Sequence, residues 1–413
     1  MKEISMDFFR DEVRNGFFIP TAVKQAWAAQ LQVLDVIETI CRKHDITYFA
    51  DWGTILGTVR HGGYVPWDDD MDICMKREDY TRFKEAAKTE LPKDFRIHDY
   101  EHQEDHWLFL SRVANSVHIN FEPEHMKQFH NFPYIAGIDI FVLDYLYKDE
   151  QQEKQRCEEV KHIIAVADSI IAGEIAQPVK EANLIQLEEK YHKTFNRKLD
   201  NRHIGIELYR LAEEQMARVP KEESDRMAQI FPWGLLGNRG QDREYYEKFV
   251  RLPFENTTMP VPADYHRILS GKYHDYFKIH KVWSGHDYPY FEGQRKNLQA
   301  VADFKLPEFT FDKAMLRQNT KEMKNSDTMQ NIAAEALLNI EKLYKAFMAE
   351  MQGKTGSVVA GSEEADDTEQ SRSEAWTDNA GQRTGQQTVR HSCWIFWRSV
   401  RVLRLIWAIL LSR

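Results

Sequence analysis

A crowded run of carboxylates early in the chain is the segment best suited to chemistry. Asp68, Asp69, Asp70 and Asp72 fall within five positions. Such crowding is electrostatically costly unless a cation offsets the repulsion, and carboxylate oxygens suit Mg²⁺ or Mn²⁺. The run therefore predicts a divalent-metal site. A solvated acidic surface is the alternative, whereas a helix-loop-helix calcium site lacks its glycine and its distal glutamate here.

Apolar residues within and after the run predict that it opens a strand over residues 71–75. Side chains two apart in a strand share a face. We therefore expect Asp70 and Asp72 to project together. Asp68 joins them if the strand starts early, and Asp69 is expected to face away.

The glycine-rich segment just before the run favours phosphate binding. Gly53 and Thr54 follow a short apolar run and open a helical stretch. Backbone N–H groups at such a helix start attract phosphate oxygens, and the Thr54 hydroxyl adds a donor. Arg60 can hold a phosphate with two N–H groups, and His61 can donate to it or act as a base. Surface charge beside a turn is the alternative reading.

Two other candidate sites are weaker. His98, His102 and His106 recur every fourth residue, a zinc-like spacing on a helix, but residues 95–100 read as a strand. The four cysteines include no close pair, so neither a disulfide framework nor a zinc motif is expected.

The elements that must position these residues alternate between helices and strands. An amphipathic helix is predicted over 21–44 and another over 77–91, with strands over 46–50, 71–75, 95–100, 107–113, 117–121 and 138–143. This order predicts an α/β or α+β sheet domain. Two or three charged helices are expected over 149–218, then a mixed segment over 230–311 and a helix over 313–351.

The composition changes sharply after Gln352. Residues 353–390 are dominated by small and polar residues and are predicted to be a disordered linker. Residues 391–413 are basic and amphipathic, with Arg398, Arg401 and Arg404 between bulky apolar residues. A peripheral membrane contact through 391–413 is one interpretation. A non-native or frameshifted end is the other.

The overall composition of the chain limits the classes of function that it can have. The 413-residue chain is 42% hydrophobic and 29% charged, with a formal net charge of −10. It can bury a sizeable core, and its acidity disfavours a nucleic-acid partner. We expect neither a signal peptide nor a spanning helix. The expected location is cytoplasmic, with the inner face of a membrane as the alternative.

The motifs together resemble the LicD family of phosphorylcholine transferases, which is related to the fukutin proteins. The resemblance lies in Gly53-Thr54-Ile55-Leu56-Gly57, Arg60-His61-Gly62-Gly63, Pro66-Trp67-Asp68-Asp69-Asp70-Met71-Asp72, Gly137-Ile138-Asp139-Ile140-Phe141 and Tyr273-His274-Asp275-Tyr276. Val142 stands where the family commonly has Pro, and His274 where it commonly has Gly. The second departure leaves the exact donor open.

The resemblance implies an α+β, nucleotidyltransferase-like mixed sheet flanked by helices, with helical additions and a disordered tail. It implies one catalytic domain over 1–350, with its core at 20–145 and helical and substrate segments at 149–350. The implied catalytic residues are Asp70, Asp72 and Asp139, which with Asp68 hold the metal; Asp144 is the alternative third carboxylate. The implied substrate-binding residues are Gly53, Thr54, Arg60, His61, Trp67 and Arg112.

The implied reaction is Mg²⁺- or Mn²⁺-dependent transfer of a phospho-substituent to a hydroxyl of a cell-surface glycan precursor, with Asp139 taking the proton. The implied donor is CDP-choline, with CDP-ribitol or CDP-glycerol as alternatives, and the acceptor is a capsule, teichoic acid or lipopolysaccharide precursor. Two other readings stay open at this point: a nucleotidyltransferase of the same fold, and a catalytically idle, membrane-associated glycan-binding protein.

Overall fold

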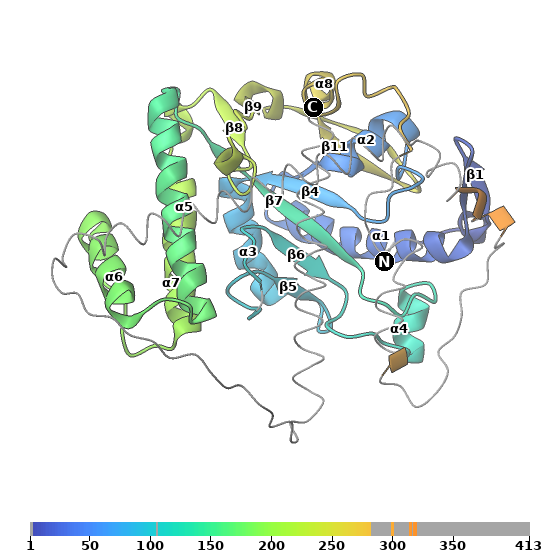
Figure 1. The fold of residues 1–413 in the computed structure, drawn as a ribbon. Helices are drawn as coiled ribbons and strands as arrows, with labels where there is room; N and C mark the ends of the chain where they lie inside the picture. The colour runs from blue at the N-terminus through green and yellow to red at the C-terminus, as the bar shows by residue number, and fades with distance from the viewer. Residues whose placement is uncertain (1–2, 105, 282–298, 301–313, 316, 320–413) are drawn as a thin grey trace, which may run out of the picture.

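The computed structural model describes residues 3–104, 106–281, 299–300, 314–315 and 317–319 (Figure 1). The predicted tail segments 353–390 and 391–413 lie outside these residues. So does the predicted helix over 313–351, apart from the few positions just named. No helix in the described ranges is both long and apolar enough to cross a bilayer.

A mixed sheet forms the centre of the fold, in the order β3-β4-β7-β6-β5, with β8 and β9 continuing from β7. The strands are β1 (Glu12–Arg14), β2 (Phe17–Ile19), β3 (Phe49–Ala50), β4 (Asp72–Lys76), β5 (Arg96–His98), β6 (Ser111–Ala114), β7 (Gly137–Tyr145), β8 (Arg226–Ala228), β9 (Gln241–Asp242), β10 (Phe249–Phe254) and β11 (Thr257–Pro262). Strands β4 and β7 are parallel, whereas the other pairs are antiparallel. This mixed, helix-flanked sheet confirms the predicted α+β class.

Helices surround the sheet: α1 (Thr21–Lys43), α2 (Trp52–His61), α3 (Arg77–Glu90), α4 (Pro123–Gln128), α5 (Glu150–Ala172), α6 (Gln177–Tyr191), α7 (Asn201–Met216) and α8 (Tyr265–Tyr273). Helix α1 begins directly after Pro20, an N-cap residue in extended conformation, and buries Trp27, Leu34 and Ile37. It packs on β6 and β7, while α3 packs on β4 and β7. Helix α2 packs on β3 and β4 and also contacts β10 and α8.

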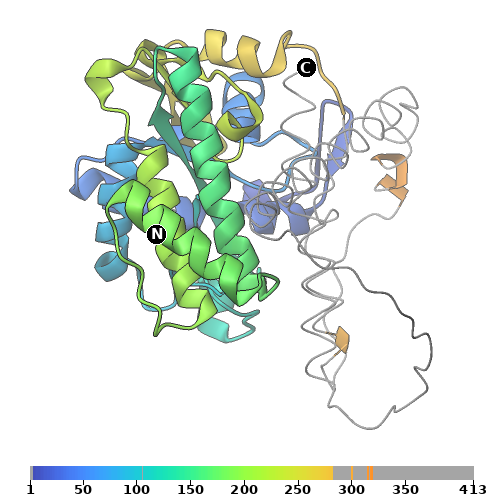
Figure 2. The same ribbon diagram turned by 60° about the vertical axis from the view of Figure 1, so that its left-hand side comes forward.

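Helices α5, α6 and α7 form a separate layer with its own apolar core (Figures 1 and 2). A buried ionic cluster ties this layer to the sheet. Arg77 donates to both carboxylate oxygens of Asp144 at 2.7 and 2.8 Å and to Glu213 of α7 at 2.6 Å. The prediction of two or three helices over 149–218 is confirmed, since three are present. Arg77 joins this layer to the end of β7.

One predicted strand is wrong. Residues 117–121 form a turn, because local side-chain hydrogen bonds replace a strand ladder. The Ser116 hydroxyl accepts from the His118 N–H, and the Asn120 side chain accepts from the Glu122 N–H. Val117 is 53% exposed and Phe121 is 37% exposed, so the alternation that suggested a strand has no buried face.

Candidate active site

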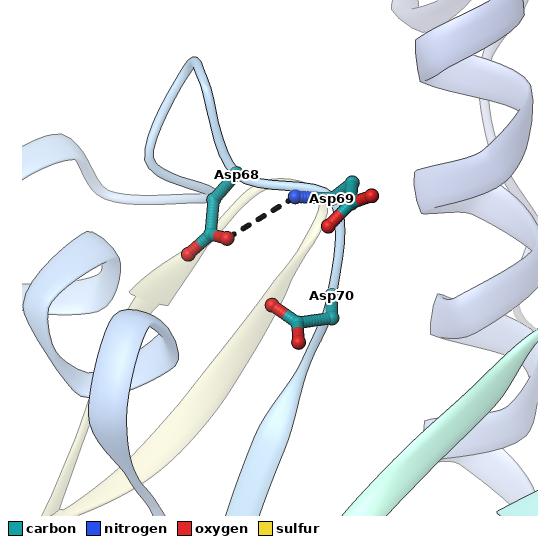
Figure 3. A group of neighbouring side chains, drawn as sticks. All are labelled: Asp68, Asp69 and Asp70. Atoms are coloured by element: carbon teal, nitrogen blue, oxygen red, sulfur yellow. Dashed lines mark hydrogen bonds between the residues drawn. The ribbon is translucent and has the colours of Figure 1, made fainter. Parts of the chain in front are cut away.

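The carboxylate run lies in the loop between α2 and β4, directly after a turn at Pro66-Trp67, and we call this segment the carboxylate turn. One carboxylate oxygen from each of Asp68, Asp69 and Asp70 lies within 4.8 Å of the others. Figure 3 shows the three side chains along one loop, where the Asp69 N–H donates to Asp68 at 3.2 Å. Asp68 and Asp69 are almost fully buried, and Asp70 is partly exposed. Three clustered oxygen donors of this kind suit a hard divalent cation.

Two side chains of helix α1 donate hydrogen bonds to the backbone of this turn. The Trp27 indole N–H donates to the Asp68 carbonyl at 3.4 Å, and the Gln30 amide donates to the Asp69 carbonyl at 2.7 Å. Both side chains are buried. Each N–H satisfies a backbone acceptor that water does not reach, which fixes the path of the turn.

Strand β4 starts at Asp72, one residue later than predicted. The alternation argument therefore does not apply to the residues before it, and the expectation that Asp69 faces away is wrong. Asp68 approaches the others because the chain turns, not because a strand starts early. The Thr54 hydroxyl, predicted to bind phosphate, accepts from the Asp72 N–H at 2.8 Å and so joins α2 to β4.

The third predicted carboxylate lies beside Asp72. Asp139 of β7 is its register partner in the parallel pair, and Arg112 of β6 faces Asp139 from the other side. The guanidinium of Arg112 holds both Asp139 oxygens, at 2.5 and 2.7 Å. Arg112, predicted as a phosphate contact, is therefore the ionic partner of Asp139 in this conformation.

The alternative third carboxylate, Asp144, lies five residues further along β7. Its side chain is 2% exposed and is held by Arg77. At about 3.3 Å per residue it is roughly 16 Å along the strand from Asp139. Its place in the ionic cluster beneath α7 favours Asp139 over Asp144.

The start of α2 is strongly organised. The Asp51 carboxylate caps the helix by accepting from the Trp52 N–H, and it also receives the Gln229 amide and the Lys272 ammonium. Lys272 lies 3.9 Å from the centre of the Trp52 ring. Gly53 leaves room for Asp68 here, because a Cβ at this position would lie 2.1 Å from the present position of the Asp68 carboxylate.

The other end of α2 carries Arg60 and His61. Arg60 donates to the carbonyls of Tyr276 and Lys278 at 2.9 and 3.3 Å, and its Nε donates to His61 at 2.9 Å. Burial, with the nearby charges of Arg60 and Arg14, lowers the pKa of His61 to about 4. His61 is therefore neutral at pH 7 and accepts a hydrogen bond.

Glu255, between strands β10 and β11, holds the glycine turn that follows His61. Glu255 accepts from Arg14 through both oxygens and from the Tyr64 N–H at 3.0 Å. A Cβ on Gly63 would lie 2.1 Å from Glu255. The Gly62-Gly63 pair thus leaves room for a buried carboxylate that holds this corner.

A pocket lies alongside α2 and opens beside the carboxylate turn. Its lining includes Gly53, Arg60, Trp67, Asp68 and Tyr273. Trp67, predicted to bind substrate, is 4% exposed and packs against Phe17 with ring centres 5.8 Å apart. The pocket therefore brings together four of the predicted site residues, Gly53, Arg60, Trp67 and Asp68, along α2 and the carboxylate turn.

Comparison with known proteins shows which family the segment with this arrangement is similar to. Residues 45–164 match the family described as "LicD/FKTN/FKRP, nucleotidyltransferase domain". The chain is also 25% identical over 264 residues to the lipopolysaccharide cholinephosphotransferase LicD of Haemophilus influenzae, covering 60% of this chain and 89% of that protein. Residues 45–164 are thus similar to the LicD nucleotidyltransferase domain, and the similarity to one LicD protein extends over most of that protein's length. A shorter similarity, 39% over 54 residues, links it to an uncharacterised protein of Rickettsia typhi, covering 13% of this chain and 18% of that protein.

The LicD match contains the carboxylate turn, α2 and Asp139, but ends before α8. His274, where the family pattern commonly has Gly, adopts a positive φ of 53° at the end of α8. This is the backbone region that glycine enters most easily. The chain therefore keeps the glycine-type turn despite the substitution.

The weak zinc hypothesis finds no support among the described residues. His98 contacts Gln103, His102 contacts Asp99, and His106 contacts the Leu110 carbonyl. His98 ends strand β5, and His102 and His106 lie in the irregular segment after it, so the four-residue spacing does not place the rings on one helix face.

Several residues that shape this site were not among the predicted site residues. Asp51, Lys272, Glu255 and Gln30 all make buried polar contacts around it. Gln30 carried a usable signal, because it is a polar residue on the apolar face of a long helix. The contacts of the other three join segments about two hundred residues apart, which no local pattern shows.

Proposed function

We propose that this protein is a LicD-type phosphotransferase that moves phosphocholine from CDP-choline to a hydroxyl of a lipopolysaccharide or related glycan precursor. The observation that carries the proposal is the cluster of Asp68, Asp69 and Asp70 beside the start of α2. The similarity to a lipopolysaccharide cholinephosphotransferase over 89% of its length supports the group transferred and the acceptor class.

The cluster fits a magnesium or manganese ion, because it offers several carboxylate oxygens and no softer ligand. We propose that Asp68, Asp70 and Asp72 bind this ion. Asp69 is included because its carboxylate lies in the same cluster. Asp139 is the further ligand that the family resemblance implies. When bound, such an ion neutralises charge on a transferring phosphoryl group and its leaving group.

The chain's own residues have separate proposed tasks. The N-terminal end of α2, fixed by the Asp51 cap, presents positive dipole to a donor phosphate. Asp139 accepts the proton of the attacking hydroxyl. For that step Arg112 must release one Asp139 oxygen, which frees its guanidinium to contact an incoming phosphate, as the sequence suggested.

The test is binding and turnover of CDP-choline by the purified chain, with and without Mg²⁺. We expect Mg²⁺-dependent binding and slow release of CMP. Asp70→Ala and Asp72→Ala should abolish turnover and keep the fold, because both side chains are partly exposed and outside the core. Asp7→Ala is the matched control, since Asp7 is 75% exposed and pairs only with Arg10 in the described structure.

Each outcome has a distinct meaning. Full activity in Asp70→Ala would contradict the metal assignment, as would binding that ignores Mg²⁺. Release of pyrophosphate from CTP, instead of CMP from CDP-choline, would identify a nucleotidyltransferase. Binding without any turnover would favour a glycan-binding protein.

A further inference from the structure

A loop beside the carboxylate turn carries two exposed apolar side chains. Residues 274–281 follow α8, and we call them the α8 loop. Phe277 is 61% exposed and Ile279 is 41% exposed, with the exposed Lys278 between them. Apolar residues scattered singly over a surface need no explanation, whereas a patch of close ones points to an interaction surface.

The α8 loop holds these side chains outward in a defined conformation. The Lys278 N–H donates to the Asp275 carbonyl at 3.1 Å. Arg60 donates to the carbonyls of Tyr276 and Lys278 at 2.9 and 3.3 Å. Tyr276 is buried and anchors the loop, while the next side chain, Phe277, is exposed. The exposure therefore belongs to a loop that hydrogen bonds fix on both sides.

The charge around the loop is opposite in sign to that of the whole chain. The chain has a formal net charge of −10, but residues 266–281 include four lysines or arginines and one acid. One of these cations, Lys272, is paired with Asp51. Arg267 and Lys278 are exposed, and Asp275 is the exposed acid. The patch therefore suits an anionic surface.

The patch lies both at the edge of the fold and next to the candidate active site. The ring centre of Phe277 is 4.4 Å from that of Tyr276 and 6.4 Å from that of His266 in α8. Helix α8 lies at the outer edge of the fold in both views (Figures 1 and 2). Lys278 and His280 line the pocket beside the carboxylate turn. A surface bound by the α8 loop is therefore close to that pocket.

The size of the patch favours a lipid surface over a protein. A stable protein interface buries about 800 Å² on each partner, far more than two side chains of a short loop provide. A membrane contact needs less, because a few apolar side chains enter the boundary between head groups and acyl chains while nearby lysines attract anionic lipids. Phe277, Lys278 and Ile279 meet both needs within three positions.

We propose that the α8 loop binds an anionic lipid surface, with Phe277 and Ile279 entering the head-group boundary and Lys278 contacting lipid phosphates. The pocket beside the carboxylate turn then lies next to the bilayer surface. This binding depends neither on the proposed phosphotransfer nor on residues 391–413.

The test places an environment-sensitive NBD fluorophore in the α8 loop of the full chain. The label is attached to Ile279→Cys in a Cys393→Ser background. The other three cysteines are buried: Cys41, Cys74 and Cys157. Vesicles of phosphatidylglycerol and phosphatidylcholine should shift the NBD emission to the blue, and vesicles of phosphatidylcholine alone should not. Adding Phe277→Ser should weaken vesicle binding about tenfold through lost apolar insertion, and Lys278→Ala should weaken it about fivefold.

Val117→Cys, labelled in the same background, is the matched control. Val117 is 53% exposed, and no lysine or arginine lies within four residues of it in the sequence. Its NBD emission should stay unchanged when vesicles are added, because it lacks the cations of the α8 loop. A blue shift at both labelled positions would show unspecific adsorption and overturn the proposal.

Three other results would also overturn it. The first is an absence of vesicle binding. The second is vesicle binding without a blue shift at position 279, which would assign the membrane contact to another segment such as 391–413. The third is a blue shift that rises with protein concentration in the absence of vesicles, which would identify a second copy of the chain as the partner of the loop.

Discussion

Replacing Gly53 by alanine should weaken metal binding while the free energy of unfolding stays almost unchanged. The new Cβ would lie 2.1 Å from Asp68 Oδ2, whereas ordinary contact begins near 3.4 Å. The carboxylate must therefore move by about 1.3 Å, the difference between these distances. We expect a movement of this size to disturb a cluster whose carboxylate oxygens lie within 4.8 Å of one another.

The folded state should tolerate the change. The Asp68 carboxylate can turn about its side-chain bonds, and alanine favours a helix interior by up to about 1 kcal/mol over glycine. We expect the free energy of unfolding to stay within about 1 kcal/mol of wild type. The affinity for Mn²⁺ should fall at least about tenfold, or about 1.4 kcal/mol.

The assay combines Mn²⁺ titration with urea unfolding, and Gly205→Ala is the control. Gly205 is a buried helical glycine in α7, where a Cβ would lie 2.3 Å from Ile171. Overpacking there should cost about 1–3 kcal/mol of stability and leave Mn²⁺ affinity unchanged. Wild-type Mn²⁺ affinity in Gly53→Ala would refute the reasoning, and so would a loss of stability that matches that of Gly205→Ala.

Two further predictions follow from buried charge. Arg77→Met should destabilise the protein by about 3–5 kcal/mol, because Asp144 and Glu213 lose the partner that offsets their burial; urea unfolding measures this, and a loss under 1 kcal/mol would contradict the ionic link between the layers. His61 should make the protein less stable as the pH falls from 6.5 to about 4, because the unfolded chain binds a proton there that the folded chain excludes. A shift of this size corresponds to at most about 3 kcal/mol, and solvent screening of a partly exposed ring reduces it to about 1–2 kcal/mol. Unfolding free energies at pH 4.5 and 7 for wild type and His61→Gln check this, and an equal pH dependence in both would show that His61 is not responsible.

The site could be predicted from the sequence where its residues are close in the chain. The carboxylate run, the start of α2 and Asp139 all belong to short motifs with apolar surroundings. The orientation of Asp69 could not be predicted, since it depends on the residue at which β4 begins. That start is set by the bond from the Asp72 N–H to Thr54, a tertiary contact.

The fold class was predictable for the same reason, since helical and strand periodicities are local. Residues 117–121 misled because Val117 and Phe121 alternate with polar residues that instead bond their own backbone. The Arg112–Asp139 pair needed the register of β6 on β7, and the Arg14–Glu255 pair needed the placement of a distant hairpin. The spacing of residues along the sequence predicts neither of these ion pairs.

The register of β4 on β7 also bears on how the protein folds. Asp72 and Asp139 become neighbours only when the parallel strands β4 and β7 pair across residues 77–136, a connection that itself contains α3, β5, β6 and α4. Closing so long a connection carries an entropic cost before any contact repays it. Helix α1 and the β10–β11 hairpin can form from local contacts, but the carboxylates cannot be assembled until this pairing is complete. Asp139 therefore joins the sequence-local run of Asp68, Asp69, Asp70 and Asp72 only once these two strands have paired.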